Sequence, residues 1–200
     1  MKLTDLKVVY ICPDHNEQYH ERKVHMDALL QRIGFTDIVH YKSETINYPA
    51  CLVNATIDIL QSYMDAPFLL IEDDVEFTEG YEFDLPPEAD AIYFGLSKYG
   101  GSPIHNWDQG LAIHEPFSDT QTRVMNMLTT HAIFYISQRY KQAVIDKLNQ
   151  YKNIPYHTDV LMTRVQPHFM VLAQKKPFFY QANKFNGTRD MESPTKITLE

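Results

Sequence analysis

The sequence predicts one α/β domain built on a mostly parallel central sheet, and three observations lead to this fold class. The chain has 200 residues, 44% of them hydrophobic, so it can bury one sizeable core. Strand-like and helix-like segments alternate over its first third, the order typical of a parallel sheet with helical crossovers. Polar residues follow the first and third strand-like segments, at the edge where such sheets bind ligands.

The alternation is read from the spacing of apolar residues. The segments are a strand at 6–11, a helix from about 18 to 33, a strand at 35–41, a helix from 50 to 63 and a strand at 67–72. Met26, Leu29 and Ile33 recur with helical spacing, and Gly34 follows as the expected C-terminal cap. These five segments predict a βαβαβ unit.

The second half continues the sheet with less regular connections. Further strands are expected at 91–96, 110–115, 123–128, 131–137, 168–174 and 177–181. Ser137 is predicted to cap a helix at its N-terminus, and a turn with a short helix is expected after Pro155. Residues 97–110, which include the only tryptophan, Trp107, show no periodicity and are predicted to form a mobile loop beside the site.

Composition excludes several classes of partner and location. The formal net charge is −8 and the densest basic spot is Lys175-Lys176, which argues against nucleic acid because phosphate contacts need clustered cations. Cys12 and Cys51 lie among apolar residues and are expected to be reduced, so a cytoplasmic, reducing location is predicted. No signal peptide is expected, and no apolar run approaches the ~18 residues of a membrane span.

Three consecutive carboxylates, Glu72, Asp73 and Asp74, close the third strand. Side chains alternate along an extended segment, so Glu72 and Asp74 are expected to share one face. Such a pair can hold Mg²⁺ or Mn²⁺ together with water and substrate phosphate oxygens. The alternative is a solvated acidic turn, because further acidic residues follow.

Other candidates each have a structural and a functional interpretation. Asp159 stands at the start of a short helix, where it either stabilises the helix terminus or acts as a general base toward an acceptor hydroxyl. His131 and His168 open strand-like runs, where a histidine is more often a core or rim residue, although His168 could reach a metal from a neighbouring strand. Arg22 in the first helix has the right charge for phosphate, but most lone helical arginines are solvated.

Four stretches together resemble a small glycosyltransferase of the GT-A fold, similar to the lipooligosaccharide-type (family 25-like) galactosyltransferases of bacteria and their viral or phage relatives. These stretches are VVYICPDHNEQYHERKVHMDALLQRIGF, YPACLVNATIDIL, FLLIEDDVEF and THAIFYISQRYKQAVIDKL, the last followed by Asp159 and VQPHFMVLAQ. The likeness spans about residues 6 to 181. It departs from the family where a usual Ser-His pair is replaced by Val53-Asn54.

The resemblance implies a Rossmann-like three-layer α/β/α fold, a nucleotide-diphosphosugar donor with a UDP-sugar favoured, Mn²⁺ or Mg²⁺, and a glycan or other hydroxyl acceptor. Asp74, Glu72 and His168 are then the expected metal ligands, and Asp159 is the expected base of an inverting enzyme. The expected donor-binding residues are Cys12, Pro13, Asp14, Arg22, Glu72 and Asp73. Neither a nucleic-acid partner nor a membrane span is expected.

The predicted function is therefore transfer of a sugar from a nucleotide-sugar to a hydroxyl group. The nucleotide-binding half is expected at about 1–95, the acceptor half at about 96–185, and a loose polar tail at 186–200. A sugar-phosphate nucleotidyltransferase is the rival enzyme. It would normally need a Gly-rich, basic loop after the first strand, whereas this chain has CPDHNEQYHERK. A non-catalytic nucleotide-sugar-binding domain is the third hypothesis.

Overall fold

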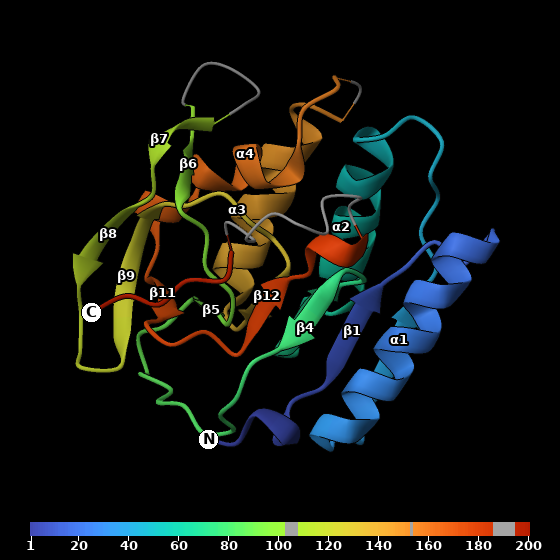
Figure 1. Cartoon of the computed structure of the whole chain (residues 1–200). Coiled ribbons are helices and arrows are strands. Elements are labelled where there is room, and N and C mark those ends of the chain that lie inside the picture. Colours follow the sequence, from blue (N-terminus) through green and yellow to red (C-terminus); the bar gives the residue numbers. More distant parts are fainter. Residues whose placement is uncertain (103–107, 153, 186–194) are drawn as a thin grey trace.

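The computed structural model describes residues 1–102, 108–152, 154–185 and 195–200, and its centre is an eight-stranded sheet (Figure 1). In spatial order the strands are β2 (Ile38–Tyr41), β1 (Val8–Ile11), β3 (Phe68–Glu72), β10 (Ala132–Tyr135), β5 (Ala91–Tyr93), β11 (Val171–Gln174), β9 (Gln121–Asn126) and β8 (Ile113–Pro116). The pairings make β2, β1, β3, β5, β11 and β8 point one way, and β10 and β9 run against them. The expected α/β fold with a mostly parallel sheet is confirmed.

Helices cover both faces of the sheet and give the molecule its three layers (Figure 1). Helix α1 (Glu17–Ile33) packs on one face together with a small ribbon of β4 (Val75–Phe77) and β12 (Phe179–Gln181). The other face carries α2 (Ala50–Ser62), α3 (Gln138–Asn149) and α4 (Thr158–Thr163). Alternate residues of each strand feed the two cores, as the two-residue period of a strand requires: Val9 and Ile11 face α2, whereas Val8 and Tyr10 face α1.

The helix termini follow the local chemistry of the sequence. The Asn16 side chain accepts a hydrogen bond from the Tyr19 amide at 3.0 Å and starts α1. Gly34 ends it at φ 101°, a left-handed conformation that glycine adopts without a steric penalty. Ser137 accepts from the Tyr140 amide at 3.2 Å and caps α3, as predicted.

Two segments differ from the expectations. Part of the predicted loop at 97–110 is a two-stranded ribbon of β6 (Tyr99–Gly101) and β7 (Asp108–Leu111), in which the Gly101 amide bonds to the Asn126 side chain. Residues 103–107, including Trp107, lie outside the described residues. Strand β4 was not predicted.

Residues 195–200 of the polar tail contact the body of the protein. Ile197 and Leu199 pack against the core, and the buried Thr195 accepts a hydrogen bond from the Gln181 amide at 2.7 Å. Apolar side chains at this end of the chain explain the contact, which the polar composition of the tail did not suggest. Within the described ranges, no helix combines the length and apolar character needed to cross a membrane.

Candidate functional site

The three consecutive carboxylates lie where β3 turns into β4, and their side chains diverge. Gln181 Nε2 of β12 lies 3.3 Å from Glu72 Oε2 and 3.4 Å from Asp74 Oδ2. Asp73 has a different partner, because its Oδ1 accepts a hydrogen bond from Arg22 Nη1 at 3.0 Å. The structure therefore groups Glu72 with Asp74, as strand alternation predicts, and gives Asp73 a separate partner.

The Glu72 carboxyl lies in an environment that disfavours its charge. Burial raises its pKa to about 8, and the negative charge of Asp74 adds to the increase. A hydrogen bond donated by Thr130 Oγ1 acts in the opposite direction. A cation beside this pair would relieve the repulsion.

The oxygen donors present fit a hard divalent cation that takes one or two carboxylates and completes its shell with water and phosphate oxygens. In the parts of the chain that the structure describes, no three His, Cys, Asp or Glu side chains form a group able to hold a metal ion by themselves. Glu72 and Asp74 alone would therefore fill only part of such a shell, and a cation beside them would need water and a bound phosphate to complete it.

A pocket of about 390 Å³ opens beside these carboxylates. It lies between the loop after β1, the connection from β2 to α2, the end of β3 and β12. Its lining residues are Ile11, Pro13, Tyr19, Arg22, Ser43, Glu44, Thr45, Tyr48, Cys51, Leu52, Glu72, Asp73, Asp74 and Gln181. Its volume lies within the range of about 300–1,000 Å³ typical of small-molecule sites.

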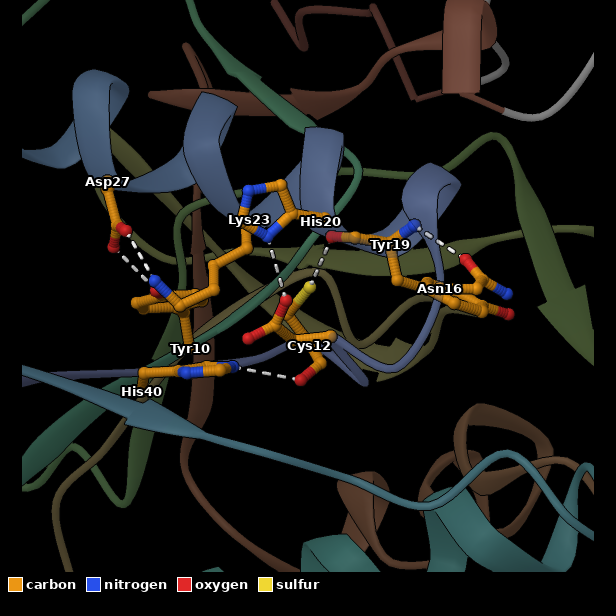
Figure 2. Close-up of polar contacts among 9 residues, drawn as sticks. Tyr10, Cys12, Asn16, Tyr19, His20, Lys23, Asp27 and His40 are labelled. Atoms are coloured by element: carbon orange, nitrogen blue, oxygen red, sulfur yellow. Dashed lines mark hydrogen bonds and ion pairs between the residues drawn. The ribbon is translucent and has the colours of Figure 1, made fainter.

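The loop after β1 forms one wall of this pocket and is held in place by polar contacts (Figure 2). His40 Nε2 lies 2.9 Å from the Cys12 carbonyl oxygen, and Cys12 Sγ lies 3.4 Å from the Tyr19 carbonyl oxygen. Asp14 has φ 48° and pairs with His20 Nδ1 at 3.2 Å, a hydrogen bond that lowers the pKa of the carboxyl. Pro13 lines the pocket, whereas Cys12 is fully buried behind it.

Cys12 has a structural environment. Burial raises the pKa of its thiol to about 12, and the nearby charge of Asp73 acts in the same direction. The thiol is therefore protonated at neutral pH and is not a nucleophile. Of the loop residues expected to bind the donor, Pro13 alone lines the pocket.

A second, smaller pocket of about 120 Å³ holds Asp159. It is lined by Tyr48, Leu52, Glu72, Thr129, Thr130, His157, Thr158, Asp159 and Gln181. The helix α4 begins after His157, which caps it without a side-chain hydrogen bond, and Asp159 Oδ1 accepts from the Val160 amide at 2.8 Å. Burial raises the pKa of Asp159, so its carboxylate is a stronger base than an exposed aspartate.

The two pockets share four lining residues, Tyr48, Leu52, Glu72 and Gln181. Sequence reasoning did not identify Tyr48 or Gln181. Tyr48 precedes α2 by two residues and its ring packs against His157 at a centroid distance of 5.6 Å. Gln181 reaches the site only through the pairing of β12 with β4, a contact between segments about a hundred residues apart that no local pattern signals.

The structure does not bring His168 to the carboxylates. It lies exposed in the turn before β11, and β11 runs parallel to β3, so His168 precedes the sheet edge opposite to the one that carries Glu72. His131 is fully buried, and burial lowers its pKa to about 4; its Nε2 lies 3.3 Å from the Phe179 carbonyl oxygen. His131 is therefore a core residue, the more common of the two interpretations.

The sheet order and the three layers define an α/β fold of the GT-A type, and a solved structure shares it. A glycosyltransferase involved in the glycosylation of the major capsid of PBCV-1 aligns with a TM-score of 0.54 over 92% of this chain and 100% of that chain, at 12% identity. At this identity the likeness establishes a common fold only.

Two weaker alignments have TM-scores below 0.5. They are the CTP:phosphocholine cytidylyltransferase from Streptococcus pneumoniae, at 0.45 with 9% identity over 92% of this chain and 97% of that chain, and a nucleoside-diphosphate-sugar pyrophosphorylase from Vibrio cholerae RC9, at 0.46 with 11% identity over 94% and 82%. No protein-family model and no curated protein matches the sequence.

Proposed function

We propose that the protein is a metal-dependent glycosyltransferase that moves a sugar from a nucleotide-diphosphosugar, with a UDP-sugar favoured, to an acceptor hydroxyl. The observation that carries the proposal is that Glu72 lines both pockets. Metal-dependent, inverting sugar transfer of the proposed kind needs a diphosphate beside a cation site and, next to it, an acceptor beside a base. The larger pocket offers the first arrangement and the Asp159 pocket offers the second.

The larger pocket has features suited to the donor. Its volume of about 390 Å³ exceeds that of the Asp159 pocket, and Arg22, which is paired with Asp73, lies on its wall. Asp74 and Glu72 would hold Mn²⁺ or Mg²⁺, which when bound supplies Lewis-acid neutralisation of charge on the departing diphosphate, worth several kcal/mol. Asp73 supports the site indirectly, because its ion pair fixes Arg22.

Asp159 is the proposed general base. Its carboxylate takes the proton from the acceptor hydroxyl while that oxygen forms a bond to the anomeric carbon. The bond from the same carbon to the diphosphate oxygen breaks, and the nucleoside diphosphate leaves with the electron pair. General-base assistance of this kind contributes about 10²–10⁴-fold in rate. Attack opposite to the leaving group would invert the anomeric centre.

A sugar-phosphate nucleotidyltransferase also uses carboxylates and a divalent ion, and the loop after β1 is what favours the glycosyltransferase. The loop after β1, residues 12–16, contains neither glycine nor a basic side chain other than His15 to hold a triphosphate.

The test begins with a thermal-shift screen of nucleotide-sugars with and without Mn²⁺, because a ligand at ~100 times its Kd adds about 2.7 kcal/mol of stability. A stabilising UDP-sugar is then incubated with hydroxyl acceptors, and release of UDP is followed. A parallel reaction contains UTP and a sugar phosphate. Release of pyrophosphate there, without transfer in the first reaction, would establish the rival activity. No stabilisation by any nucleotide-sugar would leave a protein without the proposed function.

A further inference from the structure

A third and larger hollow of about 840 Å³ adjoins the two pockets. Its walls are one face of α2, the connection from β2 to α2, and the connection from α3 to α4; in Figure 1 both connections lie near the start of α2. We call it the side groove and define it by its lining residues: Tyr41, Lys42, Glu44, Ile46, Asn47, Tyr48, Ala50, Cys51, Asn54, Ala55, Asp58, Lys152, Ile154 and Pro155.

The side groove is continuous with the proposed reaction site. Glu44, Tyr48 and Cys51 line both the groove and the pocket beside the carboxylates. Tyr48 also lines the Asp159 pocket, so one side chain borders all three spaces. A molecule with a reacting hydroxyl at Asp159 would therefore extend past Tyr48 into the groove.

The size of the Asp159 pocket makes such an extension necessary for any acceptor larger than a small alcohol. That pocket has about 120 Å³, and the groove beside it has about 840 Å³. The remainder of a bulky acceptor has to lie outside the Asp159 pocket, and the adjoining groove has the volume of a full ligand site.

The lining of the side groove matches the surface of a sugar chain. Sugars present apolar C–H faces and a ring of hydroxyl groups, so their sites combine apolar or aromatic surface with donors and acceptors. Ile46 and Ile154 are large apolar residues that stay 71% and 43% exposed at the groove. Asn47 and Asn54 supply amides, and in the described part of the chain the buried Asn54 Oδ1 accepts no hydrogen bond.

The charges of the side groove are balanced. Lys42 and Lys152 are matched by Glu44 and Asp58, and Asp58 Oδ2 accepts a hydrogen bond from the Tyr41 hydroxyl at 3.1 Å. A groove for a phosphorylated or strongly acidic acceptor would carry an excess of cations. The balance favours an uncharged partner.

We infer that the side groove is an acceptor subsite that binds a neutral oligosaccharide, so that the acceptor of the proposed reaction is a glycan of at least two sugars. This inference rests on the proposed function in placing the reacting end of the saccharide at Asp159. The class of ligand is inferred from the groove itself. The neighbouring residues Val53 and Asn54 then have different roles. Val53 is fully buried in the core, and Asn54 lines the groove that would hold the acceptor.

The test uses an array of defined neutral mono-, di-, tri- and tetrasaccharides, probed with the labelled 200-residue protein in the presence of UDP and Mn²⁺. Native protein is expected to bind some of the longer saccharides at least tenfold more tightly than the monosaccharide that ends them. Asn54→Leu and Ile154→Arg are expected to lose that advantage. Gln61→Leu, the same amide-to-leucine change at an exposed position of α2 outside the groove, is expected to keep it.

Two variants on different walls keep the test decisive if one of them fails to fold. Equal affinity for mono- and oligosaccharides, native-like oligosaccharide binding by both groove variants, or no saccharide binding at all would overturn the inference. Calorimetric titration of native protein with UDP and Mn²⁺ distinguishes failure of the groove inference from failure of the proposed function. UDP binding without length-dependent saccharide binding overturns the groove alone, and saccharide binding without UDP binding overturns the transferase and leaves the groove.

Discussion

Arg22 Nη1 donates a hydrogen bond to Asp73 Oδ1 at 3.0 Å, and this ion pair joins α1 to the end of β3. The two side chains are 13% and 12% exposed, so water screens the pair little. Arg22 Nη2 also donates to the Phe185 carbonyl oxygen at 2.6 Å. The central carboxylate of the acidic triplet is thus neutralised within the protein, which leaves Glu72 and Asp74 as the repelling pair.

Arg22→Met is expected to destabilise the protein, because it leaves Asp73 charged and buried without its partner. Removing one member of a buried pair costs about 3–5 kcal/mol. With some residual exposure, we expect about 3 kcal/mol, a fall in Tm of about 6–12 °C for a chain of this length. Thermal denaturation followed by circular dichroism measures it. Arg32→Met, at an exposed position of the same helix, is the control, and equal effects of the two changes would contradict the assignment.

Asp74→Ala is expected to abolish the metal-dependent part of UDP binding, because Asp74 is proposed to ligate the cation that bridges to the diphosphate. Calorimetric titration with UDP in Mn²⁺ should give the weak affinity that native protein shows without metal. Glu79→Ala removes an exposed carboxylate from the same acidic stretch and should bind UDP normally. Undiminished UDP binding by Asp74→Ala in Mn²⁺ would remove Asp74 from the metal site.

Asp159→Asn is expected to keep donor affinity and lose transfer. The amide is nearly the same size as the carboxylate but cannot accept the acceptor proton, so the rate should fall by about 10²–10⁴-fold. Initial rates of UDP release at saturating acceptor, together with UDP titration of the same variant, separate catalysis from binding. A variant with near-native transfer would show that Asp159 serves only the terminus of α4.

The features that were predicted correctly are those that neighbouring residues encode. The periodicity of 6–72 gives the βαβαβ unit, and single residues such as Gly34 and Ser137 fix helix ends. The position of the acidic triplet after β3 follows from the same local pattern.

The features that were missed depend on partners distant in the chain. Strand β4 has three residues, too few to show a period, and exists because β12 pairs with it. That pairing brings Gln181 to the carboxylates. His168 was expected to reach the metal site, and its position also depends on distant pairing. It precedes β11, and the direction of β11 in the sheet places it at the edge opposite to Glu72.

The contacts of Asp90 predict how the stability of the fold changes at acid pH. Its fully buried carboxylate accepts hydrogen bonds from Arg139 Nε at 2.6 Å, Ser137 Oγ at 2.6 Å and the Met170 amide at 2.9 Å. Burial by itself acts to raise the pKa of Asp90, but these hydrogen bonds outweigh it and hold the pKa below the ordinary value.

Because the pKa of Asp90 is lower in the folded than in the unfolded state, Asp90 stabilises the fold at any pH above its pKa in the unfolded chain, about 3.9. This stabilisation is lost as the pH falls through the pKa of Asp90 in the folded state. Asp90→Asn is expected to cost about 2 kcal/mol at pH 7, the scale of a hydrogen bond to a charged group. The difference from native protein should begin to shrink below about pH 4, where Asp90 of the unfolded chain becomes protonated, and should disappear at lower pH, where folded Asp90 is protonated as well. Urea denaturation across this pH range measures it, with exposed Glu88→Gln as the control. A difference independent of pH would refute the electrostatic account.

Lys141 of α3 is fully buried and binds the carbonyl groups at the C-terminal end of α2. Its Nζ donates to the carbonyl oxygens of Tyr63 at 2.8 Å, Met64 at 3.2 Å and Ala66 at 2.6 Å, and it lies 5.4 Å from the centroid of the Phe68 ring. The ammonium group thus meets the negative end of the helix dipole and carbonyl groups that have no intrahelical donor. Burial lowers the pKa of Lys141, because removing the charged ammonium group from water costs free energy.

Two effects oppose one another in Lys141→Met, which keeps the length of the side chain and removes its charge. Methionine avoids the cost of burying an ammonium group, but it leaves three carbonyl groups without their donor, at about 1–3 kcal/mol for each one that water cannot reach. Tyr63 and Met64 are half-buried and Ala66 is exposed, so water can replace part of the lost hydrogen bonding. We therefore expect a net loss of about 2 kcal/mol, or about 4–8 °C in Tm. Lys147→Met, on the same helix with a partner at the surface, should change Tm little. If Lys141→Met instead raises Tm, the desolvation cost exceeds the hydrogen bonds, and the contact between α2 and α3 is maintained by apolar packing alone.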